Sequence, residues 1–124
     1  LFSGGTLDLI TPPLSEQLGL FMSIPVHTLS RVILVEGASH FSAIGLKKDT
    51  HKNPNKEDDL FQLGEEFVGV QPIQVQRILS AEIIKFLDQI EQGVVINKSR
   101  HLQTDGLRLH RLNRSTVEQI LDNQ

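Results

Sequence analysis

The clearest pattern along the chain is an unbroken apolar run of four residues, Val32 to Val35, which stands between Arg31 and Glu36. The run is too short for a helix and rich in β-branched residues, so it predicts a β-strand. A strand with no polar positions is covered on both faces, as in a parallel sheet between two layers of helices. The pattern therefore predicts an α/β fold.

Two segments have the apolar spacing of amphipathic helices. The first runs from Leu14 to Met22, after two prolines of the kind that a first helical turn tolerates, and ends before Pro25. The second is longer, and one face of it carries Val75, Ile78, Leu79, Ile83, Phe86, Leu87 and Ile90. Gly93 follows at a typical C-cap position, so we expect this helix to end there and its apolar face to form core.

The other strand signals are weak. They are a stub at Leu1 and Phe2 and short candidates at 67–70, 94–96 and 107–109. A fully apolar strand with so few neighbours leaves backbone groups unpaired, so we expect more of the sheet to lie before Leu1. The stretch 45–59 is polar and without periodicity, and it predicts a surface loop.

The last thirty residues are expected to add little to the fold. Residues 94–105 show no regular pattern, Leu107 and Leu109 alternate with polar residues, and 115–118 have the form of a capping box that opens a short helix. We therefore divide the chain into 1–92, which carries the main α/β part, and 93–124, a C-terminal appendix with a short strand and helix.

Composition excludes several classes of protein. The net charge is −3 with acids and bases interspersed, so there is no basic face for nucleic acid. Cysteine is absent, which excludes disulfides and thiolate metal sites but leaves the cellular compartment undetermined. The longest apolar run is far shorter than the roughly 20 residues of a transmembrane helix, so we expect no membrane span in this chain.

Candidate chemistry lies at Asp8, within Gly4 to Pro12, and at His40, just past the apolar strand. Their separation leaves room for a loop, a helix and a strand, which is one crossover unit. Such a unit brings both residues to the same edge of a parallel sheet. An acid followed by a histidine is the order of the last two members of a Ser, Asp, His triad in α/β hydrolases. No Gly-x-Ser-x-Gly motif is present, so a serine nucleophile would lie upstream of Leu1.

Structural alternatives exist for each residue. Asp8 is also suited to capping the helix that it precedes, and His40 to hydrogen bonding with loop backbone. Ser39 and Ser42 flank the histidine but follow no strand-to-helix elbow, so we interpret them as hydrogen-bonding loop residues. Both loops carry glycines expected to allow a sharp turn off the preceding strand: Gly4, Gly5 and Gly37.

The sequence indicates no metal and no cofactor. The histidines other than His40 stand at 27, 51, 101 and 110, with no pair at i, i+4 or in a His-x-His arrangement, and there is no cysteine to assist them. The acidic cluster at 57–59 lacks the frame of a calcium loop.

At these motifs the chain resembles the α/β hydrolases. Within that family it is similar to bacterial, largely cyanobacterial, hydrolases related to dienelactone hydrolase and to plasma-type platelet-activating-factor acetylhydrolase. The likeness covers about 1–92, and the matching segments are Gly-Gly-Thr-Leu-Asp8-Leu-Ile-Thr-Pro, Pro-Leu-Ser-Glu-Gln, Val-Ile-Leu-Val-Glu-Gly-Ala-Ser-His40-Phe-Ser and Phe67-Val-Gly-Val-Gln-Pro.

The resemblance implies the C-terminal part of a three-layer α/β-hydrolase fold, with its last parallel strands and flanking helices. It also implies a serine esterase that forms an acyl-enzyme on a small-molecule or lipid ester, with Asp8 as acid and His40 as base. The nucleophile elbow, the oxyanion hole and most of the family's sheet are missing here, so we expect the isolated chain to be inactive.

Two alternatives stay open at this stage. One is a noncatalytic binding or scaffolding module with a hydrolase-like frame. The other is a complete small α/β domain that uses the 75–90 helix face against a partner.

Overall fold

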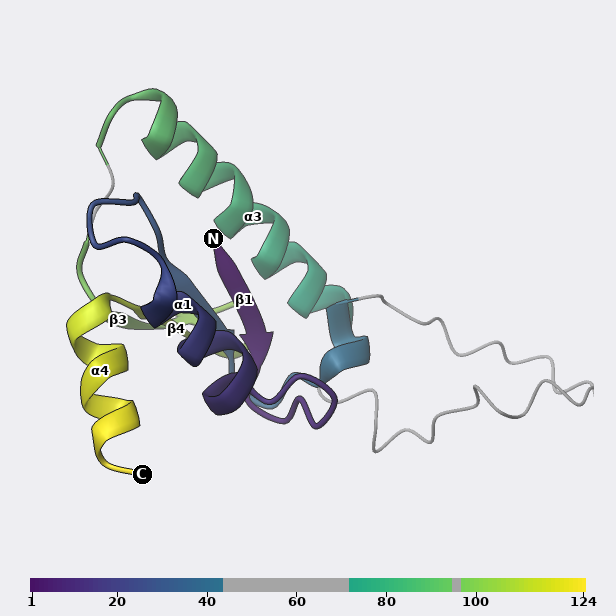
Figure 1. The fold of residues 1–124 in the computed structure, drawn as a ribbon. Helices are drawn as coiled ribbons and strands as arrows, with labels where there is room; N and C mark the ends of the chain where they lie inside the picture. Colours follow the sequence, from purple (N-terminus) through teal and green to yellow (C-terminus); the bar gives the residue numbers. More distant parts are fainter. Residues whose placement is uncertain (44–71, 95–96) are drawn as a thin grey trace, which may run out of the picture.

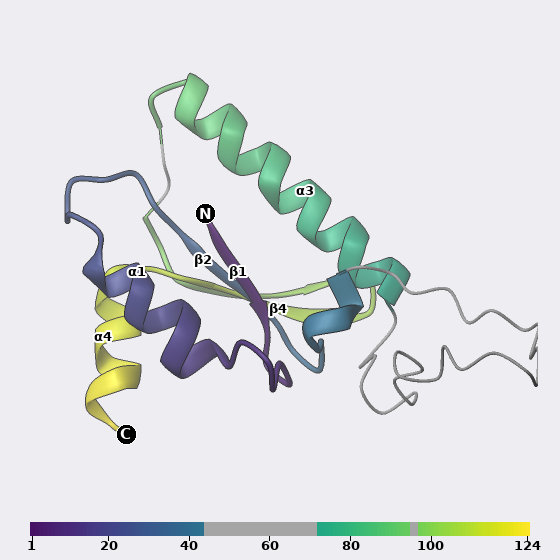
Figure 2. The ribbon, with the colours of Figure 1, turned by 45° about the vertical axis from the view of Figure 1, so that its right-hand side comes forward.

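Residues 1–43, 72–94 and 97–124 are described by a computed structural model. They form a four-stranded sheet with helices on both faces (Figures 1 and 2). In spatial order the strands are β1 (Phe2–Gly5), β2 (Val32–Val35), β4 (Leu107–Leu112) and β3 (Arg100–Thr104). The α/β class is thereby confirmed. The expected parallel sheet is instead mixed, because β1 and β2 are parallel whereas β4 is antiparallel to both β2 and β3.

The apolar run forms β2, as its pattern predicts, and all four of its residues are buried. The strand has a neighbour along each edge, β1 on one side and β4 on the other. Its backbone groups are therefore paired within the described residues. The inference of further sheet from an unpaired central strand does not hold, because β4 takes the second edge.

Helices cover both faces of the sheet, with α3 on one side and η1, α1 and α4 on the other (Figure 2). Their bounds are Pro13–Leu18 for the π-helical η1, Gly19–Ser23 for α1, Pro72–Glu91 for α3 and Arg114–Asp122 for α4. The core beneath α3 consists of Ile33, Val35, Ala38, Val75, Ile78, Leu107 and Leu109. The core on the other face consists of Leu18, Phe21, Val32, Leu34, Leu112 and Val117.

The long helix ends where its sequence predicts. Gly93 has φ +69°, its N–H bonds to Ile90 O at 3.0 Å, and the N–H of Val94 bonds to Gln89 O at 2.9 Å. The bond that spans five residues and the left-handed glycine form a Schellman-type C-cap. Only glycine adopts this conformation without steric cost, which is why the stop is readable from sequence.

The apolar face of α3 is core only in part. Val75, Ile78 and Phe86 are buried, but Ile83, Leu87 and Ile90 are 45%, 57% and 41% exposed. A polar residue, Glu82, occupies a position against the sheet and is 2% exposed. The expectation that the whole apolar face is core is wrong for its outer flank, which consists of Ile83, Leu87 and Ile90. The side of the helix that carries Glu82 lies against the sheet instead, because Arg111 of β4 binds this carboxylate.

Residues 94–105, expected to be irregular, contain β3. β3 and β4 are joined by a two-residue turn in which Asp105 has φ +49° and Gly106 has φ +79°. Positive φ at both central positions is the type I′ hairpin pattern, for which Asp-Gly is a preferred sequence. The expectation was wrong because β3 carries polar side chains and pairs along one edge only.

The last helix begins two residues earlier than its sequence suggests. Asn113 is the N-cap of α4, and its side-chain oxygen accepts a hydrogen bond from Thr116 N at 3.0 Å. Ser115 lies inside the first turn, so the expected capping box is not formed. Arg114 donates hydrogen bonds to Met22 O and Ile24 O, which fastens α4 to the C-terminal end of α1.

Three sequence-based predictions fall on residues outside the described ranges. These are the strand candidate at 67–70, part of the candidate at 94–96, and the polar loop at 45–59. In the part of the chain that the structure describes, no helix is both long and apolar enough to span a bilayer.

Candidate functional site

Two loops meet where the parallel strands β1 and β2 end. The N–H groups of Thr6 and Leu7 donate to Val35 O at 3.1 Å and to Ala38 O at 2.9 Å. The Thr6 hydroxyl oxygen accepts a bond from Gly37 N at 2.8 Å. Parallel strands release their following loops at the same edge of the sheet, and these bonds hold the two loops side by side.

The glycines of these loops have different tasks. Gly37 has φ +78° and supplies the turn that the sequence analysis assigns to it. Gly4 lies within β1 and makes no turn, which corrects the expectation for it. Gly5 ends β1, and its carbonyl oxygen accepts a hydrogen bond from Asp8 N at 3.2 Å, so the turn after the strand begins at this glycine. A Cβ on Gly5 would lie 2.0 Å from Ala38 O and 2.4 Å from its carbonyl carbon, so no side chain fits there. Glycine at position 5 is required by the close approach of the two loops.

Asp8 follows β1 and is buried, with 6% of its surface exposed. Its Oδ1 accepts hydrogen bonds from Ile10 N at 3.0 Å and from Thr11 N at 2.8 Å, and its Oδ2 accepts from Thr11 Oγ1 at 2.8 Å. Burial raises the pKa of the Asp8 carboxyl, but the bonds from Thr11, His40 and Ile10 outweigh it, so this pKa lies below its ordinary value. Asp8 is therefore a carboxylate at neutral pH.

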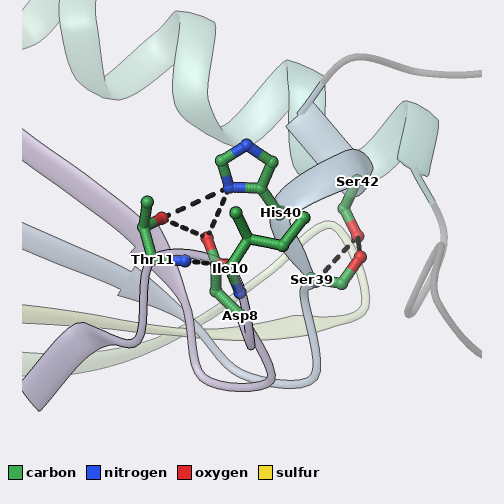
Figure 3. Close-up of polar contacts among 6 residues, drawn as sticks. All are labelled: Asp8, Ile10, Thr11, Ser39, His40 and Ser42. Carbon is green, nitrogen blue, oxygen red and sulfur yellow. Dashed lines mark hydrogen bonds and ion pairs between the residues drawn. The ribbon is translucent and has the colours of Figure 1, made fainter. Parts of the chain in front are cut away.

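His40 opens the short 3₁₀ turn η2 (His40–Ala43), and its ring reaches across to the Asp8 loop (Figure 3). Its Nδ1 lies 3.1 Å from Asp8 Oδ2 and 3.2 Å from Thr11 Oγ1. The other ring nitrogen, Nε2, is on the side of the ring away from Asp8 and toward α3 (Figure 3). Two residues 32 positions apart are thus brought into contact at one sheet edge, as their spacing predicts.

The structure separates the alternatives for Asp8. The helix after the loop has Pro12 as its N-cap and no side-chain capping bond, so Asp8 does not cap it. Instead Asp8 accepts the backbone bonds of its own turn and also faces the imidazole. The contact of Thr11 with both Asp8 and His40 was not predicted from the sequence. The available signal was a hydroxyl three residues after the acid, a spacing that favours side-chain bonds within a turn.

Ser39 and Ser42 bond to one another within the histidine loop (Figure 3). Ser39 N donates to Ser42 Oγ at 3.0 Å, Ser42 N donates to Ser39 O at 3.2 Å, and the two hydroxyl oxygens lie 3.3 Å apart. Ser42 is fully buried. These are the contacts of loop residues that hold a turn.

A cleft of about 280 Å³ opens beside Asp8 and His40, which together form the dyad of this site. Its polar lining includes Asp8, Thr11 and His40, and Val75 and Leu79 of α3 contribute apolar side chains. A cleft close to the lower end of the size range of small-molecule sites, with a few convergent polar groups, suits the reacting part of a small ligand. An ionised carboxylate that holds an imidazole beside such a cleft is equipped for general acid and base chemistry.

The histidines of the hairpin come together in a way that linear spacing does not show. The Nδ1 atoms of His101 and His110 lie 2.6 Å apart across β3 and β4, and His110 Nε2 lies 3.2 Å from Glu36 Oε2. Across residues 1–43, 72–94 and 97–124, however, no group of three or more His, Cys, Asp or Glu side chains is arranged to hold a metal ion.

No protein family, curated protein or solved structure matches this chain. The chemistry proposed for the site rests on its own geometry and on the two motifs that contain Asp8 and His40.

Proposed function

We propose that this chain supplies the acid and the base of a serine hydrolase that cleaves carboxylic or lipid-type esters. Asp8 orients His40, and His40 acts first as general base and then as general acid. The nucleophilic serine belongs to a segment that precedes Leu1. The observation that carries the proposal is the contact of 3.1 Å between the buried Asp8 carboxylate and His40 Nδ1.

The mechanism follows from which nitrogen holds the proton. With Nδ1–H donated to Asp8, Nε2 presents a lone pair that removes the proton of the serine hydroxyl as its oxygen attacks the ester carbonyl carbon. The protonated imidazole then gives that proton to the departing alkoxide, which leaves an acyl-enzyme. Water repeats the sequence: Nε2 takes its proton, the hydroxide attacks the acyl carbon, and the serine oxygen recovers the proton.

The open side of the sheet supports the place given to the missing nucleophile. Strand β1 is paired along one edge only within the described sheet, and its carboxyl end carries Asp8. Ion pairs of α3 with Asp105 and with Arg111 place the polar flank of this helix over β4 and the hairpin turn. The exposed apolar flank, with Ile83, Leu87 and Ile90, therefore faces the β1 side. A further strand beside β1 would cover this flank and end next to the dyad.

The deciding experiment is His40→Ala in a protein that includes the upstream sequence. We expect kcat for ester hydrolysis to fall by about 10⁴-fold and fluorophosphonate labelling of the nucleophile to be lost, because the serine loses its base. His27→Ala is the matched control, since His27 is exposed and outside the cleft. A His40→Ala protein that still turns over ester would refute the assignment. A folded wild-type protein without labelling at any serine would favour the noncatalytic module.

A further inference from the structure

We infer that Thr11 is a positioning residue of this site, whose hydroxyl acts together with the Asp8 carboxylate to select the Nδ1–H tautomer of His40. The catalytic consequence of this inference rests on the proposed function. The hydrogen-bond geometry on which the tautomer depends does not.

The direction of each bond follows from the number of hydrogens present. Thr11 Oγ1 lies 2.8 Å from Asp8 Oδ2, and an ionised carboxylate oxygen only accepts hydrogen bonds. The single hydroxyl hydrogen of Thr11 is therefore donated to Asp8. Oγ1 then has only lone pairs to offer to His40 Nδ1, which is 3.2 Å away.

His40 Nδ1 thus faces two acceptors, Asp8 Oδ2 at 3.1 Å and Thr11 Oγ1 at 3.2 Å. An unprotonated Nδ1 would direct its lone pair at both oxygens, whereas a protonated Nδ1 shares one hydrogen between them. In the neutral ring the proton is therefore held at Nδ1, and Nε2 carries the lone pair. This is the tautomer that a general base acting through Nε2 requires.

Thr11 itself is held in place from two sides. Its backbone N–H donates to Asp8 Oδ1 at 2.8 Å, so the carboxylate is bound by both the main chain and the side chain of one residue. The following Pro12 restricts the backbone of Thr11 to extended conformations. The hydroxyl is consequently fixed between the acid and the imidazole, as Figure 3 shows.

The test is ¹⁵N NMR of histidine-labelled full-length protein at a pH where the ring is neutral. In the wild type we expect His40 to show a protonated Nδ1 and an unprotonated Nε2. Thr11→Val keeps the shape and the backbone bond but removes the hydroxyl, and it should lower the Nδ1–H population. Thr11→Ser restores the hydroxyl and should retain the wild-type spectrum. Thr104→Val, on β3, is the control for loss of a threonine hydroxyl elsewhere.

Two outcomes would overturn the inference: a wild-type His40 protonated at Nε2, or an unchanged tautomer in folded Thr11→Val. If Thr11→Val does not fold, Thr11→Ala removes the same hydroxyl with a smaller side chain and is measured in its place. In an active protein, Thr11→Val should lower kcat by about tenfold with KM unchanged, and Thr11→Ser should restore it. Absence of esterase activity in every variant, with the tautomer shift present, would remove the proposed function and leave the inference standing.

Discussion

The distance between the two loops of the site depends on single residues. Gly5 lets the β1 strand end against the carbonyl of Ala38, and Asp8 sits three residues further on with both oxygens hydrogen bonded. A change at Gly5 or Asp8 also acts on the loop that carries His40, because the Leu7 N–H donates a hydrogen bond to Ala38 O and so joins the two loops. The geometry of the dyad therefore depends on a buried glycine as well as on its own side chains.

Gly5→Ala should destabilise the protein by about 3 kcal/mol, because backbone atoms rather than a flexible side chain occupy the place of the new Cβ. Urea unfolding measures this effect. Gly4→Ala is the matched control, since a Cβ there meets its nearest neighbours at an ordinary 3.5 Å. Equal unfolding free energies for the two variants would contradict the close approach.

At the scale of elements, α3 is attached to the sheet by charge as well as by apolar contacts. Arg111 of β4 donates two hydrogen bonds to Glu82, at 2.7 and 2.6 Å. Burial raises the pKa of the Glu82 carboxyl, but the hydrogen bonds and charges of Arg111 and Lys85 together lower it by more, so this pKa lies below its ordinary value. The exposed outer flank of the same helix lacks such a contact in the described residues.

The pair predicts an acid-dependent loss of stability. A carboxyl pKa lower in the folded than in the unfolded chain gives stability that is complete above the unfolded pKa and disappears as pH falls through the folded one. We expect the free energy of unfolding to fall on acidification below about pH 5. Replacing both partners, as Glu82→Leu with Arg111→Met, should reduce that fall, with Asp8 responsible for a remainder. Identical pH profiles of wild type and double variant would exclude the pair as a source.

For the whole molecule, the C-terminal residues have a larger part in the sheet than their sequence indicates. β4 pairs with β2 along the whole length of β2, from Val32 to Val35, and α4 buries Val117 in the core beneath the sheet. The division of the chain into 1–92 and 93–124 follows the sequence and does not separate two parts of the sheet. In space, β4 stands between β2 and β3.

Deletion of 97–124 should abolish cooperative unfolding, because β2 would lose one paired edge and part of the cover on its face. Thermal and urea transitions followed by circular dichroism measure this loss. Deletion of residues 123 and 124 alone, beyond the end of α4, is the control. A truncated chain that keeps a cooperative transition at the wild-type midpoint would show that these residues are an appendix.

Local patterns were enough to predict the elements that depend on local physics. The apolar run predicts β2, the helical spacing predicts η1 with α1 and also α3, and Gly93 predicts the end of α3. The Asp105-Gly106 pair is also a local signal for the β3–β4 hairpin, but β3 was not recognised as a strand because most of its residues are polar. For the site, the order and spacing of Asp8 and His40 predicted their meeting.

The sequence by itself thus determined β2, η1 with α1, and α3, and which two side chains converge, because periodicity, turn residues and the geometry of a crossover unit act along the chain. Only the tertiary structure decided that β4 completes the sheet, that Glu82 lies buried against Arg111, that Gly5 meets Ala38, and that Thr11 stands between acid and imidazole. Those outcomes depend on contacts between residues distant in sequence, and a pattern along one chain does not state which of its surfaces will meet.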